Sequence, residues 1–171
     1  GTGKIQVETI NVNNYKDITQ KTFNYIEFMP TENDTLLDTN AIIERWTNES
    51  LIEKKYHFVD IPFLIPIHVN RNIYGNKINT CSVDIMKKIK FSTSDDSNQK
   101  NMSWQIHGVI CYSKTTQQYY SLIQLISGDW YMYDSTQKPS IYKIENMKKD
   151  DFNFKIKEEC VFILYRLDSY L

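Results

Sequence analysis

The chain has 171 residues and is 41% hydrophobic, enough for one domain that buries roughly 70% of the surface its unfolded form would expose. Lys and Arg number 20 against 21 Asp and Glu, so no bulk charge indicates a nucleic acid or an anionic membrane as partner. No apolar run approaches about 18 residues and no signal peptide is recognisable, so we expect no membrane span.

The N-terminal quarter is predicted to hold two strands and a helix. Gly1-Thr2-Gly3 resembles an expression remnant, which leaves 4–171 as a single domain. Apolar residues alternate imperfectly over 4–12 and more regularly over 23–29, which predicts two strands that form a hairpin. The pattern that opens with residues 34–38 and continues through Trp46 predicts a helix that ends near Asn48.

The middle of the chain is predicted to contain one strand and a polar loop. A strand is expected over 64–71, and Pro66 within it indicates an edge or bulged position, because proline cannot donate to a strand ladder. Residues 87–90, with three lysines, are typical of a solvated strand end. The compositions of 92–100 and 145–151 predict surface loops that are too short to divide the domain.

The C-terminal part is predicted to be a series of strands. Apolar and aromatic residues over 104–112, 119–126 and 130–134 predict three strands in sequence, with Gly128-Asp129 as the turn between the last two. Residues 160–166 are apolar almost throughout, which predicts a strand buried on both faces.

Four segments, in this order, resemble the C-terminal palm and fingers half of the ubiquitin-specific protease domain. The family carries aromatic-x-Leu-x-Gly-Val-Ile, Gly-His-Tyr, Trp-Tyr-x-Phe-Asp and Ala-Tyr-x-Leu-x-Tyr-x-Arg. The corresponding segments here are Trp104-Gln-Ile-His-Gly-Val-Ile110, Gln117-Gln-Tyr119, Trp130-Tyr-Met-Tyr-Asp134 and Cys160-Val-Phe-Ile-Leu-Tyr-Arg166. The resemblance extends over 35–167 and implies a cysteine-protease-like α+β fold: a mostly antiparallel, palm-like sheet with one or two helices, lacking the helical thumb.

The same comparison implies a degenerate catalytic triad. The family's histidine position falls on Gln118, and an amide does not titrate near neutral pH, so it cannot activate a thiol. Asp134 matches the aspartate that orients the histidine in the family, and Gln117 replaces the preceding glycine. The family's Asn-x-Gly-x-x-Cys box, which supplies the nucleophile, is missing from the sequence.

The cysteines and histidines offer no replacement. Cys81, Cys111 and Cys160 are far apart in sequence, which is typical of free thiols in a reducing compartment, so we expect an intracellular protein of the cytoplasm or nucleus. His107 and Cys111 would share a strand face but stand about 13 Å apart. His68 is expected to pack in the core and His57 to lie in a polar connector. We therefore expect no metal site and no cofactor.

Two functions remain open. The first is an inactive, pseudo-deubiquitinase module that binds ubiquitin or another protein through Gln117, Tyr119, Trp130 and Tyr133. The second is the C-terminal part of an active ubiquitin thiolesterase whose cysteine lies on a missing or separate segment. A purely architectural role in a larger assembly is a weaker third possibility. Because the thumb would otherwise pack on the palm, we expect a protein partner, or a second copy, near Gln118 and Asp134.

Overall fold

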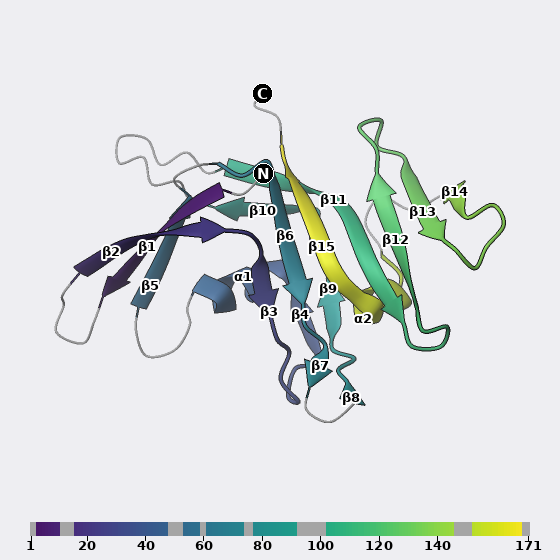
Figure 1. Cartoon of the computed structure of the whole chain (residues 1–171), viewed down its shortest axis with the longest axis horizontal. Helices are drawn as coiled ribbons and strands as arrows, with labels where there is room; N and C mark the ends of the chain where they lie inside the picture. Colours follow the sequence, from purple (N-terminus) through teal and green to yellow (C-terminus); the bar gives the residue numbers. More distant parts are fainter. Residues whose placement is uncertain are drawn as a thin grey trace.

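A large, mostly antiparallel sheet dominates the computed structural model, which describes residues 3–10, 16–47, 53–58, 61–73, 77–91, 102–145 and 152–168 (Figure 1). Its strands are β3 (Ile26–Phe28), β6 (Leu64–Val69), β10 (Lys88–Phe91), β11 (Met102–Ser113), β12 (Gln118–Gln124), β13 (Trp130–Asp134), β14 (Ile141–Lys143) and β15 (Cys160–Leu167). They lie in the order β14-β13-β12-β11-β15-β6-β3, and β10 pairs with β11 beside this path. We call it the central sheet, and it confirms the α+β, mostly antiparallel prediction.

The remaining strands form smaller sheets. A three-stranded sheet has the order β2-β1-β5, with β1 (Gly3–Ile10), β2 (Lys16–Phe23) and β5 (Glu53–Phe58). Two-stranded sheets join β4 (Leu36–Asp38) to β9 (Ser82–Asp84) and β7 (Asn72–Ile73) to β8 (Lys77–Ile78). The helices are α1 (Thr39–Thr47) and α2 (Phe154–Glu159). No helix in the described part of the chain is long and apolar enough to cross a membrane.

The predicted hairpin between 4–12 and 23–29 is wrong. β1 pairs antiparallel with β2 on one side and with β5 on the other, whereas β3 joins β6 in parallel. The sequence patterns of β2 and β5 are polar, so hydrophobic periodicity does not reveal either strand. His57 consequently lies in β5 and not in a connector.

The predicted helix also begins later than its pattern suggested. Residues 36–38 pair in parallel with β9, and α1 starts at Thr39. The Ala41 amide donates to Asp38 Oδ1 at 2.7 Å, so Asp38 satisfies a free N–H of the first turn. The helix ends at Thr47, close to its predicted end.

The core lies on one face of the central sheet, where both helices are found behind the strands in the view of Figure 1. Tyr165 on β15 and Thr39 of α1 join their hydroxyls at 3.0 Å across this layer. The fully buried members include Trp104, Tyr165, Ile65, Ile67, Val109 and Ile163. We call this the core face and the opposite side the outer face.

The last strand is not buried on both faces as predicted. The burial of β15 alternates, with Ile163 and Tyr165 buried on the core face and Phe162 and Leu164 only half-buried on the outer face. The described residues place no second layer over the outer face. The expectation for Pro66 is confirmed locally, because β3 pairs with β6 only from Ile67 onward, so Pro66 has a strand on one side only.

Candidate functional site

Gln118 and Asp134 lie on neighbouring strands but do not bond to each other. Asp134 is opposite Tyr120 in the β12–β13 pairing, which places Gln118 nearer the turn that precedes β12. The Ser135 hydroxyl donates to Gln118 Oε1 at 3.2 Å. Asp134 Oδ1 accepts from the Thr136 hydroxyl at 2.6 Å and from its backbone N–H at 2.9 Å, and these bonds lower the pKa of Asp134. Gln118 thus bonds to the residue that follows β13, whereas Asp134 bonds within its own turn.

Gln117 occupies an unusual backbone conformation. Its φ is +55°, in the left-handed region that favours glycine, and it ends the turn between β11 and β12. A glycine would adopt this conformation without the strain that a Cβ imposes.

None of the three thiols can serve as a nucleophile in this conformation. Cys81, Cys111 and Cys160 are free and buried. Burial is the main cause that raises the pKa of each, and the effect is large for Cys111. Cys111 and Cys160 lie opposite each other on β11 and β15, inside the core.

A bulge in β11 places His107 and Cys111 on opposite faces of the central sheet. The pairing of β11 with β15 shifts between Ile106 and Gly108, so His107 is the extra residue of a bulge. The alternation of burial changes phase there, which leaves His107 half-exposed and Cys111 buried on the core face. The expectation that the two share a face is therefore wrong, and burial together with the charge of Arg166 lowers the pKa of His107.

His68 lies on the outer face and not in the core, contrary to expectation. Its ring stacks on Phe162 with centroids 4.5 Å apart, and its Nδ1 is 3.8 Å from Glu27 Oε1. It is half-buried because the outer face has no described cover.

The structure divides the proposed binding residues between the two faces. Tyr119 and Tyr133 are 63% and 48% exposed on the outer face, so their predicted exposure is confirmed. The Tyr119 ring lies 5.0 Å from that of Tyr112 on β11. Trp130 points to the other face, where it packs edge-on against Phe152 at 5.3 Å, so it does not join the two tyrosines.

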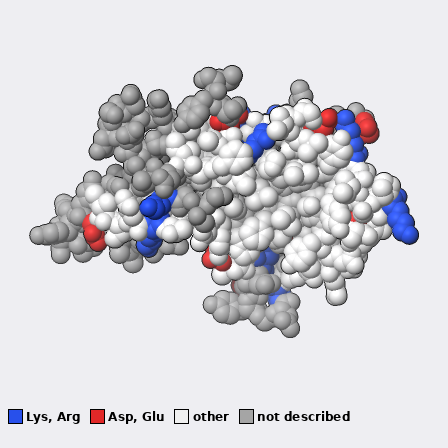
Figure 2. All heavy atoms as spheres, turned by 45° about the horizontal axis from the view of Figure 1, so that its top comes forward, with Lys and Arg blue, Asp and Glu red and all other residues white. Residues whose placement is uncertain are grey.

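The outer face presents a row of aligned residues across seven strands. Strand pairing brings into register Ile141, Tyr133, Ser121, Ile110, Phe162, His68 and Glu27. Glu27 is the one acidic residue among them, and none of them is Lys or Arg. Figure 2 shows the surface of the sheet as mainly uncharged, with Lys, Arg, Asp and Glu gathered towards its margins.

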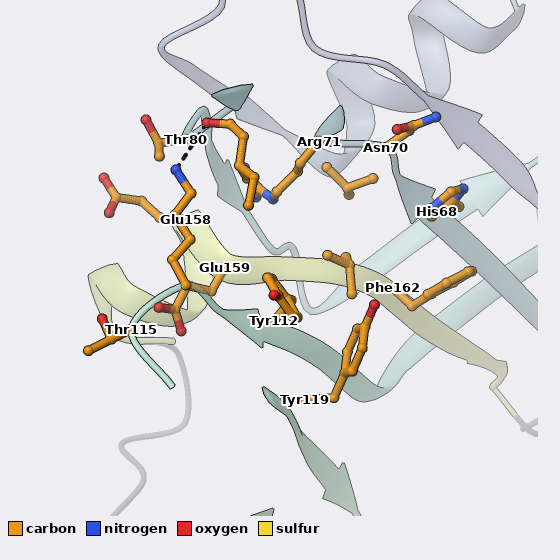
Figure 3. A pocket seen from close by; sticks show the side chains of 14 residues that line it. His68, Asn70, Arg71, Thr80, Tyr112, Thr115, Tyr119, Glu158, Glu159 and Phe162 are labelled. Atoms are coloured by element: carbon orange, nitrogen blue, oxygen red, sulfur yellow. Dashed lines mark hydrogen bonds between the residues drawn. The ribbon is translucent and has the colours of Figure 1, made fainter. Parts of the chain in front are cut away.

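A pocket of about 640 Å³ opens at one end of this face (Figure 3). Tyr112, Tyr119, Phe162 and His68 provide aromatic walls, and Glu158 and Glu159 line the side near α2. A neighbouring hollow of about 580 Å³ shares Tyr112 and Lys114 with the pocket and reaches Gln117. The pocket therefore adjoins Gln117, the residue before Gln118.

Arg71 shapes the wall of this pocket and was not identified as a site residue from the sequence. The side chain is buried and donates to the carbonyls of Cys160 at 2.7 Å, Cys81 at 2.7 Å, Lys157 at 2.9 Å and Asn79 at 3.2 Å. It thereby ties the end of α2 and the start of β15 to the segment before β9. A single arginine after an apolar strand is too weak a signal to predict this role.

Within the described ranges, no group of three or more His, Cys, Asp or Glu residues is placed to hold a metal ion. The arrangement instead offers an aromatic-walled pocket beside exposed tyrosines. Such a surface can hold a segment of a protein.

Comparisons by sequence and by structure give different results. No family model matches the sequence, and no curated protein sequence matches it either. Among solved structures, the yeast SAGA DUB (deubiquitinase) module with an Sgf73 mutant is similar, with a TM-score of 0.67 and 11% identity over 97% of this chain and 38% of that chain. The SAGA Ubp8/Sgf11/Sus1/Sgf73 DUB module bound to ubiquitin aldehyde gives 0.65 and 9%, over 98% and 41%.

A third similar structure is the same module bound to monoubiquitin, with a TM-score of 0.67 and 8% identity over 98% of this chain and 41% of that chain. The chain thus spans about two fifths of the length of these neighbours. Identities this low establish the fold alone. The chain has the α+β fold of a cysteine-protease-like deubiquitinase, matched over nearly its whole length.

Proposed function

We propose that this chain is a ubiquitin-specific-protease-like module that binds a protein partner without cleaving it. The observation that carries the proposal is the state of the catalytic positions. Gln118 bonds to Ser135, Asp134 bonds to Thr136, and all three cysteines are buried with raised pKa. A hydrolase of this type needs a thiolate beside an imidazole, and the described residues place neither at this position.

The surface beside these positions favours binding. Tyr119 and Tyr133 are large and exposed, and Tyr112 and Phe162 wall the pocket. The residues aligned between Tyr133 and Phe162 on the sheet, Ser121 and Ile110, are uncharged. Aromatic enrichment with few charges at the centre is typical of protein interfaces. An exposed sheet face with this composition supports the expectation of a partner near Gln118 and Asp134.

Ubiquitin is the partner that we propose to test first. Two of the similar structures are described as bound to ubiquitin aldehyde and to monoubiquitin, and this chain reproduces their fold over 98% of its length. An intracellular location, expected from the free thiols, would give access to that partner.

A ubiquitin probe with a carboxy-terminal electrophile, combined with a titration of ubiquitin followed by NMR, tests the proposal. We expect no covalent adduct and a measurable affinity that Tyr119→Ala weakens about tenfold or more. Phe154→Ala is the matched control, because Phe154 is an aromatic residue that is 69% exposed but does not line the pocket. Labelling of any cysteine would refute the inactive module.

The active-thiolesterase alternative makes a different prediction in the same assay. A separate cysteine-bearing segment, added in trans, would have to restore labelling although Gln118 stands at the histidine position. If ubiquitin neither binds nor labels, the partner is another protein, and the fold is retained without the ubiquitin specificity of its neighbours.

A further inference from the structure

The edge strand β2 presents a long, open backbone ladder. It pairs over eight residues with β1 on one side, and no described strand pairs with its other side. Residues 17–22 are exposed on both strand faces, and they include no proline and no bulge. Such an edge can accept a further strand through its free N–H and C=O groups.

The order of side chains on β2 is complementary to itself. Antiparallel pairing of two β2 strands about a two-fold axis at Thr19 would place Asp17 opposite Lys21 of the second copy. By symmetry, Lys21 would lie opposite Asp17 of the second copy. Thr19 would face Thr19, and Ile18 would face Gln20. Opposite charges and threonine pairs at directly opposed positions are both stabilising in antiparallel ladders. Among the described residues, neither Asp17 nor Lys21 makes an ion pair within its own chain.

We propose that two copies of this chain associate edge to edge through β2, in the register centred on Thr19. The result is a continuous six-stranded sheet with the order β5-β1-β2-β2-β1-β5 and an isologous, closed interface. The three-stranded sheet lies at the opposite end of the molecule from β12, β13 and β14 (Figure 1), so the dimer leaves the outer face and its pocket free. The inference therefore stands independently of the proposed binding function.

Charge reversal tests the register. We expect the wild-type chain to dimerise reversibly in sedimentation equilibrium at low salt. Asp17→Lys or Lys21→Asp should each weaken the dimer about tenfold or more, because each sets like charges opposite each other twice. The double variant should regain wild-type affinity, and an equimolar mixture of the two single variants should form a heterodimer. Circular dichroism checks that these exposed substitutions leave the fold intact.

A cross-link provides a second readout. With glutathione disulfide as oxidant, Thr19→Cys should form a disulfide-linked dimer. In this register residue 19 is the one position that lies directly opposite the same position of the second copy. Gln20→Cys is the control and should cross-link far more slowly. A wild-type chain that stays monomeric at the highest concentration would overturn the proposal. A dimer whose dissociation constant neither charge reversal changes would overturn it as well.

Discussion

Ser135 donates a hydrogen bond of 3.2 Å to the side-chain oxygen of Gln118, so the turn after β13 is joined to the start of β12. The serine follows Asp134 directly, so the end of β13 supplies the partner of the amide, while Asp134 itself turns to Thr136. The contact between the two strand ends is a neutral hydrogen bond. It has no group that could accept a proton from a thiol near neutral pH.

The thiols should be inert in the folded protein. Because Cys81, Cys111 and Cys160 are buried and burial raises the pKa of each, we expect negligible reaction with a thiol reagent such as Ellman's reagent at pH 8. All three should react quickly once denaturant is added. Absorbance of the released thiolate measures both states, and rapid reaction of one equivalent in the native protein would contradict the buried arrangement.

Gln117→Gly should give a higher free energy of unfolding than Thr115→Gly, a glycine substitution in the same turn. At φ +55° a residue with a Cβ is strained by about 1 kcal/mol, which glycine relieves, although glycine also adds entropy to the unfolded chain. Thr115→Gly in the same turn has no such strain to relieve, so it should destabilise by about 0.5–1 kcal/mol. Urea unfolding measures both, and equal effects of the two substitutions would rule out the strain.

Arg71→Met should be among the most destabilising single substitutions. It removes the donors for the buried carbonyls of Cys81 and Cys160, so we expect a loss of about 3–5 kcal/mol in the free energy of unfolding. Arg166→Met, on the half-buried outer face, is the control and should cost less than about 1 kcal/mol. A loss below 1 kcal/mol for Arg71→Met would show that water replaces the lost donors.

Asp34 should contribute stability that disappears in acid. Hydrogen bonds from Arg45 and Thr31 lower the pKa of Asp34 to about 2, below its unfolded value of about 3.9. The contribution is therefore complete above about pH 4 and is lost as the pH falls towards 2. Since Arg45 is half exposed, Asp34→Asn should cost only about 1 kcal/mol at pH 7.

The control for this substitution is Glu32→Gln, which changes the charge equally but removes none of these hydrogen bonds. The pH dependence of the unfolding free energy between 5 and 2 is the measurement. An identical slope in Asp34→Asn and in the wild type would mean that the Arg45 contact adds nothing.

The sequence by itself determined the strands of the C-terminal half of the chain. The strands at 104–112, 130–134 and 160–166 follow from apolar runs between turn residues. Composition also excluded a large net charge of either sign.

Only the tertiary structure decided how the strands pair and which side chains meet. β2 and β5 are polar strands held by their neighbours' backbones, so periodicity could not find them. The bulge at His107, the burial of Arg71 and the open outer face depend on contacts between segments far apart in sequence. The sequence of a strand indicates which of its faces is apolar. Whether one or both faces of the sheet are covered by another layer depends on the assembled fold.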